Sequence, residues 1–277
     1  VVVALAGAAQ ATEAPQFRQQ LIEACDQHTD KGRHKQALAC ITKLEKSASS
    51  KELRFLFYSR LTSLIAQDKL DEAQTLVADK IAKHQGDPEG WEIWLHNASN
   101  WVAWGRGDLP RAVAETEGMK ESASRVQLPP PQTRGAMLHY LWDRAYLLLD
   151  LALAQSPVQA AALATAEAAR QDYHKVADPV AESDGLAVLD AYFALRQGRG
   201  KEAMAHVAKV ERGPNGDLQD QYIVALALEA GGDKKGADAV RKIIRTSKNV
   251  YPMKALIVRQ LPLDKKKSPI GAPAPAN

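Results

Sequence analysis

The sequence predicts an all-α protein: a right-handed solenoid of about six antiparallel helix pairs, followed by a C-terminal capping helix. Two observations lead to this fold class. About one residue in six is alanine, which is the best helix former and a poor strand former. In addition, six similar turn sequences recur 34 to 49 residues apart, and a period in this range is typical of helical repeat arrays.

Composition and charge exclude several classes of protein. The chain of 277 residues is 45% hydrophobic and 25% charged, as expected of a globular protein with a core and not of a disordered chain. Its net charge of +3 is small and dispersed, so nucleic acid is not an expected partner. After the apolar residues at the N-terminus, no apolar run approaches the roughly 20 residues that a membrane span needs. We therefore expect no integral membrane segment.

The first eleven residues are apolar and end in Ala9-Gln10-Ala11. This pattern is typical of the end of a signal peptide with an Ala-x-Ala cleavage site, and charged residues follow from Glu13 onwards. We therefore interpret residues 1–11 as a signal-peptide remnant that is cleaved near Ala11, and expect a periplasmic or secreted protein. A buried N-terminal helix is the alternative.

The recurring turns define the helix pairs. In four of them a glycine precedes an alanine by five residues, and Asp68 takes the place of the glycine in a fifth. We expect the glycine to end the first helix in the left-handed conformation. The alanine then lies where the two helices cross too closely for a larger side chain. These anchor alanines are Ala37, Ala73, Ala112, Ala161, Ala203 and Ala237, and Ala161 follows the weakest match.

In this unit the sequence resembles the tetratricopeptide repeat (TPR) family, whose repeat is a helix pair of about 34 residues. Leu186 to Ala239 carries the resemblance best, and residues 16–250 share it more loosely. As in that family, a small residue lies twelve positions before three of the anchors, at Cys25, Ala191 and Ala225; Leu61, Asn100 and Leu149 depart from the pattern. The resemblance implies a TPR-like domain over residues 12–262 and a generic binding scaffold.

Prolines and lysines mark the breaks along the chain. Pro129-Pro130-Pro131 predicts an extended loop over residues 128–133, either a bend in one solenoid or the boundary between two halves. A last helix from Met253 to Gln260 is expected to cover the apolar end of the array. Residues 263–277, rich in Lys, Pro and Ala, are predicted to form a disordered tail, whose lysines are solvated or touch an anionic surface.

Cys25 and Cys40 are the two cysteines of the chain. In an exported protein such a pair suggests a disulfide, and the two residues fall on the two helices of the first predicted pair, where they can face each other. Reduced core thiols are the alternative. No Cys-x-x-Cys motif or histidine at ligand spacing accompanies them, so redox chemistry and a metal site are not expected.

Four of the five tryptophans lie between Trp91 and Trp104, and three of these share one helical face with Asn97. In TPR arrays the first helix of each pair lines the concave groove, and groove positions lie about 18, 15, 11 and 8 residues before the anchor. That count reaches Tyr or Trp in five successive repeats, along with Phe55, Asp143 and Val188. The predicted binding set is Tyr58, Trp94, Asn97, Trp101, Trp104, Tyr146, Asp150, Tyr192, Arg196 and Tyr222. Such rings are typical of binding hot spots; the alternative is that they fill the core between helices.

These patterns predict an exported scaffold that binds a protein or peptide in its concave groove, in envelope assembly or a secretion system. A carbohydrate-binding accessory protein for an envelope polysaccharide, using the Trp-rich helix, is the alternative. We expect no enzyme, cofactor or metal, because the seven histidines are scattered and no nucleophile elbow, phosphate loop or His-Glu-x-x-His motif is present.

Overall fold

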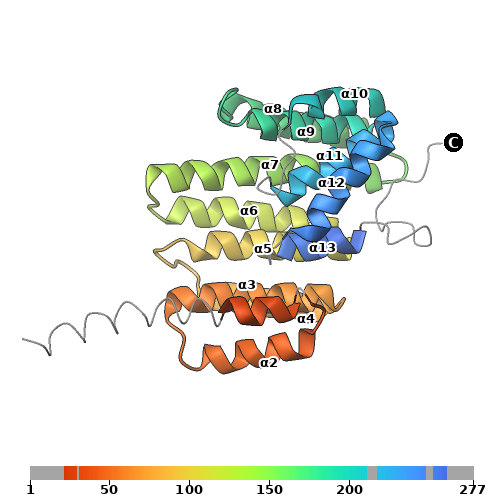
Figure 1. The fold of residues 1–277 in the computed structure, drawn as a ribbon. Coiled ribbons are helices and arrows are strands. Elements are labelled where there is room, and N and C mark those ends of the chain that lie inside the picture. Colours follow the sequence, from red (N-terminus) through yellow and green to blue (C-terminus); the bar gives the residue numbers. More distant parts are fainter. Residues whose placement is uncertain (1–21, 30, 211–216, 248–251, 261–277) are drawn as a thin grey trace, which may run out of the picture. The chain divides into compact units, whose positions relative to one another are not determined.

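A computed structural model describes residues 22–29, 31–210, 217–247 and 252–260. This part of the chain is helical and contains no strand (Figure 1), which confirms the predicted all-α class. The predicted signal-peptide remnant (residues 1–11) and the predicted tail (residues 263–277) lie outside the described residues. No helix among those described is long and apolar enough to cross a membrane.

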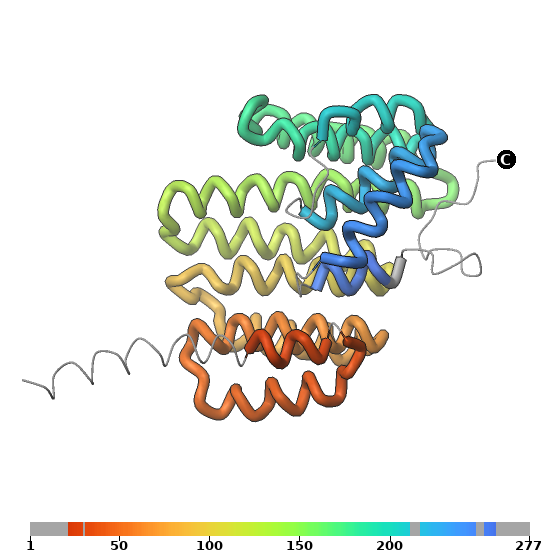
Figure 2. Tube along the Cα trace, in the orientation of Figure 1, coloured from red at the N-terminus to blue at the C-terminus, as the bar shows by residue number. Residues whose placement is uncertain are grey.

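The helices follow one another in the predicted order of pairs. Residues 22–29 are helical and pair with the first labelled helix. The labelled helices are α2 (His34–Glu45), α3 (Ser50–Ala66), α4 (Leu70–Lys83), α5 (Trp91–Arg106), α6 (Leu109–Arg125), α7 (Pro130–Ala154), α8 (Ala160–Val176), α9 (Ser183–Arg196), α10 (Gly200–His206), the short 3-10 helix η1 (Val207–Lys209), α11 (Leu218–Gly231), α12 (Lys234–Thr246) and α13 (Pro252–Gln260). Most helices pack against their neighbours in the chain, as α5, α6 and α7 do in Figure 2.

The chain forms two compact units. One comprises Val1–Ala73 with Lys248–Ala255, and the other Gln74–Ser247 with Leu256–Asn277. The segment 128–133, where the sequence predicts a loop, lies inside the second unit, and the loop prediction is wrong from residue 130 onwards. Pro130 and Pro131 form the first turn of α7, after Pro129 as its N-cap. Proline is tolerated there because the first backbone N–H groups of a helix have no partner within the helix.

The first unit is built around its cysteines. Cys25 and Cys40 lie at disulfide distance, with their Cα atoms 5.5 Å apart. Cys25 belongs to a small core with Ile22, Ile41 and Leu56. The arrangement matches the prediction that these cysteines face each other across the first helix pair.

One turn conformation occurs five times among the residues that the structure describes. After α5, Gly107 has a φ of 76° and donates its N–H to the Trp104 carbonyl, while the Asp108 N–H reaches back to the Ala103 carbonyl. This double hydrogen bond is the Schellman motif, which satisfies carbonyls at the end of a helix. The same two bonds end the helices before Gly32, Gly198 and Gly232, and before Asp68, which adopts a φ of 64°.

The predicted anchor alanines are confirmed at five of six positions. Each is the fourth residue of the second helix of its pair and is fully buried; these residues are Ala37, Ala73, Ala112, Ala203 and Ala237. The prediction for Ala161 is wrong, because Ala161 is exposed. The link between α7 and α8 has no residue with positive φ, α8 begins at Ala160, and its buried alanines are Ala166 and Ala169.

The last helix of the predicted fold is present as α13. In the second unit, the Leu256 side chain lies against α5 at Gly105, where a Cβ atom would come within 2.3 Å of it. Leu256 therefore packs on the Trp-rich helix, at a glycine that leaves room for a leucine. This contact is with a helix from the middle of the chain, and not with the last helix pair that α13 was expected to cover.

The anchor positions can be tested by a matched pair of substitutions. Ala112→Leu places a large side chain in a fully buried crossing, and we expect it to lower the free energy of unfolding by about 1–3 kcal/mol. Ala161→Leu adds the same volume at an exposed site and should change it by less than about 0.5 kcal/mol. Urea denaturation followed by circular dichroism measures both, and equal effects would contradict the assignment of the crossing.

The cysteine pair gives a second prediction. Closing a chain separation of 15 residues stabilises by about 3 kcal/mol in the chain-entropy model, so Cys25→Ala with Cys40→Ala should destabilise the protein by an amount of this order. Thiol titration of the unfolded, unreduced protein should detect no free thiol. Two free thiols in that assay would contradict the bridge.

Candidate functional site

The predicted binding residues of the second unit lie on the first helices of successive pairs. We call them, together with Asp143, the first-helix face: Trp94, Asn97, Trp101 and Trp104 on α5, Asp143, Tyr146 and Asp150 on α7, Tyr192 and Arg196 on α9, and Tyr222 on α11. Tyr58, the remaining predicted residue, lies on α3 in the first unit, half-buried beside the ring of Phe57.

A buried polar contact joins α5 to α7. The Asn100 amide donates from Nδ2 to Asp143 Oδ2 over 2.8 Å, and both side chains are buried. Asn100 occupies the position that the TPR pattern gives to a small residue. A polar side chain at a position that the fold buries needs a partner; the sequence analysis did not predict this pair, although the polar residue at a small-residue position could have indicated it.

A second buried carboxylate joins α7 to α9. Asp150 accepts hydrogen bonds from the Tyr192 hydroxyl at 2.9 Å and pairs with Arg196 Nε at 2.8 Å. The Trp104 indole also donates to it, and Tyr222 lies near the ion pair. Burial raises the pKa of Asp150, while Arg196, Tyr192 and Trp104 act to lower it. Asp150 is thus a structural carboxylate whose charge is compensated.

The aromatic side chains of the face differ in exposure. Trp101 is buried, and Trp94 and Trp104 are half-buried. The Trp94 ring meets His139 edge-on, with centroids 5.6 Å apart. Tyr146, which is buried, packs against Tyr192 at 5.9 Å. The stripe on α5 therefore combines a core tryptophan with two rings that are partly exposed.

Asp143 differs from Asp150 in having no cationic partner among the described residues. Its recorded neighbours are the Asn100 amide and a second carboxylate, Asp217, which caps the N-terminus of α11. Burial, together with the charge of Asp217, raises the pKa of Asp143 to about 8, against the opposing effect of Asn100. At neutral pH the folded protein therefore holds Asp143 mainly as the neutral acid.

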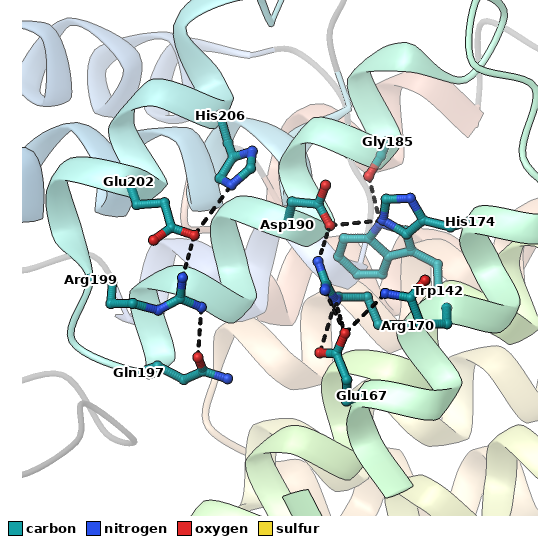
Figure 3. A network of polar contacts seen from close by, with 11 residues as sticks. Trp142, Glu167, Arg170, His174, Gly185, Asp190, Gln197, Arg199, Glu202 and His206 are labelled. Carbon is teal, nitrogen blue, oxygen red and sulfur yellow. Dashed lines mark hydrogen bonds and ion pairs between the residues drawn. The ribbon is translucent and has the colours of Figure 1, made fainter. Parts of the chain in front are cut away.

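Polar networks elsewhere in the second unit are internally satisfied. In Figure 3, Arg170 of α8 donates to Asp190 of α9 at 2.6 Å and also binds Glu167, and His174 contacts the same Asp190 oxygen at 2.8 Å. Figure 3 also shows Arg199, Glu202 and His206 in contact along the start of α10. These charges compensate one another and hold helices together, so we do not treat them as a binding site.

One constellation contains the residue types of a catalytic triad. Glu115 accepts from Ser99 at 2.7 Å and contacts His96 Nδ1 at 2.7 Å. In a triad the histidine lies between the serine and the acid, whereas here the acid lies between the other two. This order leaves the serine without a general base. Among the described residues, no group of three His, Cys, Asp or Glu side chains is placed to hold a metal ion.

No protein-family model, curated protein or solved structure matches the chain. The function must therefore be inferred from the first-helix face itself.

The raised pKa of Asp143 predicts how stability depends on pH. Because this pKa lies above the unfolded value of about 3.9, the unfolded chain loses its proton first as pH rises. The contribution of Asp143 to stability is thus full below about pH 4 and is lost as pH rises through about 8, by up to about 1.4 kcal/mol per pH unit. Asp220, whose pKa is also raised to about 8 by burial and by Asp217, acts in the same direction.

Asp143→Asn should make the free energy of unfolding fall less steeply between pH 5 and pH 8. The slope should decrease by up to the amount that one bound proton contributes. Urea titrations across this range measure it. Asp172→Asn is the matched control, because the Asp172 side chain is 47% exposed and paired with Lys175. An unchanged slope in Asp143→Asn would show that the carboxyl ionises normally in the folded chain.

Proposed function

We propose that this protein is an exported scaffold of the TPR type, a right-handed solenoid that binds a protein or peptide partner along the first-helix face. The observation that carries the proposal is the face itself, where half-exposed Trp94 and Trp104 lie among buried polar groups from successive helix pairs. Rigid aromatic rings with nearby hydrogen-bonding groups are typical of interaction hot spots.

The repeated turn supports the assignment to a repeat scaffold. Five turns share the same pair of hydrogen bonds and are followed by a buried alanine at the same helical position. A structural unit that recurs in this way indicates stacked helix pairs, each of which buries its apolar side against its neighbours. Repeat scaffolds of this kind use the surface formed by successive first helices for binding.

The proposed location outside the cytoplasm rests on two observations. The N-terminal residues have the pattern of a signal peptide, and the Cys25–Cys40 pair lies at disulfide distance, which is compatible with an oxidising compartment. A role in envelope assembly or secretion follows from this location and from the scaffold class.

A polysaccharide ligand is a second candidate, and the half-exposure of Trp94 and Trp104 is what favours it. Apolar faces of sugar rings stack on such indoles, and Asp150 lies beside Trp104 as a hydrogen-bond acceptor. This second candidate uses the same residues, but the ligand would be a polysaccharide instead of a protein or peptide.

Crosslinking followed by affinity capture from a periplasmic extract tests the proposed face. Trp104→Ala and Trp94→Ala should each reduce recovery of the partner roughly tenfold or more, because hot-spot tryptophans carry a large share of binding energy. The matched control is Val180→Ala, in the exposed turn between α8 and α9, where the side chain is 83% exposed.

Equal recovery with all three variants would contradict the assignment of the face. If the captured material is polysaccharide and its recovery depends on Trp94 and Trp104, the second candidate replaces the first. Circular dichroism spectra identical to wild type establish that a loss of binding is not a loss of fold.

A further inference from the structure

The first-helix face presents two buried carboxylates on α7, seven residues apart, with opposite surroundings. Asp150 is compensated by Arg196 and Tyr192. Asp143, of which 3% is exposed, has the Asn100 amide and the Asp217 carboxylate as neighbours and no cation among the residues described. Burying an acid without a compensating charge is costly, so this arrangement points to a ligand that supplies the charge.

Two buried amide oxygens on α5 have no hydrogen-bond partner, and one of them belongs to the residue that binds Asp143. The Oδ1 atoms of Asn97 and Asn100 have no hydrogen-bond partner, although these side chains are only 2% and 0% exposed. The Asn100 Oδ1 belongs to the same amide that donates to Asp143, so it is held at the carboxylate. Asn97 precedes Asn100 by one helical turn on the same face of α5. These side chains therefore present hydrogen-bond acceptors without partners, which a ligand with N–H donors would satisfy.

Exposure falls along a short path toward this site. His139 is exposed, Trp94 in contact with its ring is half-buried, and Asp143, one turn further along α7 from His139, is buried. A long side chain with a charged end suits such a gradient, because its apolar stem can lie along the Trp94 ring while the end reaches the acid. Asp217, at the exposed N-terminus of α11, adds negative charge nearby.

We propose that Asp143, Asn97 and Asn100 bind the cationic end of a lysine or arginine side chain of the partner. This inference rests on the proposed function, because it names the group that the first-helix face recognises. An ammonium or guanidinium group carries three or five N–H donors and no acceptor, which matches a set of side chains whose free atoms are carboxylate and amide oxygens. A calcium ion requires six to eight oxygen ligands, more than the four oxygens of these three side chains.

Binding of the cation is coupled to loss of the Asp143 proton. The titratable groups that face Asp143 are Asp217 from α11 and Tyr146 from its own helix, with His139 one turn away at the rim. The raised pKa of Asp143 means that the acid must ionise to form the ion pair. The affinity for a basic side chain should therefore rise between about pH 6 and pH 9, a range in which lysine stays charged.

The test uses two matched peptides and a small amine. Acetyl-Ala-Ala-Lys-Ala-Ala-amide, the same peptide with norleucine for lysine, and n-butylammonium chloride are titrated into the full chain. Tryptophan fluorescence and calorimetry measure binding at about pH 6 and about pH 8.5. We expect the lysine peptide to bind roughly tenfold more tightly than the norleucine peptide, and its affinity to increase at the higher pH.

Two variants identify the site, and one controls for surface charge. Asp143→Asn should abolish the preference for lysine and its pH dependence while the protein remains folded, since the substitution removes the ionisable carboxyl group and keeps its shape. Asn97→Leu should weaken lysine binding by removing one acceptor. Asp172→Asn should leave both peptides unchanged. Equal affinity for the two peptides in the wild type, or a lysine preference that survives Asp143→Asn, would overturn the proposal.

Failure of this inference can be told apart from failure of the proposed function. Peptide binding that depends on Trp104 but shows no lysine preference retains the scaffold function and overturns the cation site. Butylammonium binding that depends on Asp143, without binding of either peptide, supports the cation site and counts against a peptide ligand.

Discussion

The Schellman turn followed by a buried alanine is the constraint on which the rest of the described structure depends. A left-handed residue such as Gly107 reverses the chain within a few residues, so that the next helix starts almost at once. A reversal this tight forces two helix axes close together, and only a small side chain fits at the fourth residue of the second helix. Because the same turn recurs, the same close crossing recurs, and helix pairs of similar geometry follow one another.

This geometry brings the first helices of successive pairs into contact. The bonds between Asn100 and Asp143, between Trp142 and the Gly185 carbonyl, and between Tyr192 and Asp150 span 43, 43 and 42 residues. Each of these sequence separations is close to the length of one repeat. Each hydrogen bond therefore links the first helix of one pair to the first helix of the next pair. The first-helix face therefore follows the repeat spacing, and it continues across the α7–α8 pair, whose turn has no left-handed residue.

The sequence predicted the parts of the fold that depend on local chemistry. Gly five residues before Ala identified four of the turns, and the φ of 64° at Asp68 shows that Asp in the same place adopts the same conformation. The weakest match failed: without a left-handed residue the turn before α8 takes another form, and Ala161 is exposed. Pro130 and Pro131 were misassigned to a loop because proline both breaks helices and begins them, and only the context of α7 decides between the two.

The chemistry of the face was predictable only in part. The count from the anchors gave Tyr192 from Ala203, which is buried, but it gave Tyr146 and Asp150 from Ala161, which is exposed. It could not distinguish Asp143 from Asp150, since the difference lies in partners 40 or more residues away in sequence. Asn100, a polar residue at a position where the repeat buries a small one, is the feature of the sequence that could have indicated a buried partner.

The difference between the two carboxylates of α7 bears on why such a face exists. A residue kept only for stability would resemble Asp150, with a cation and a hydroxyl beside it. Asp143 has no cation beside it among the described residues and lies near another carboxylate, so its ionised form is costly in the folded chain. Buried groups that lower stability are found where binding or catalysis requires them. The arrangement is therefore best explained by a ligand that provides the missing charge and relieves the cost when it binds.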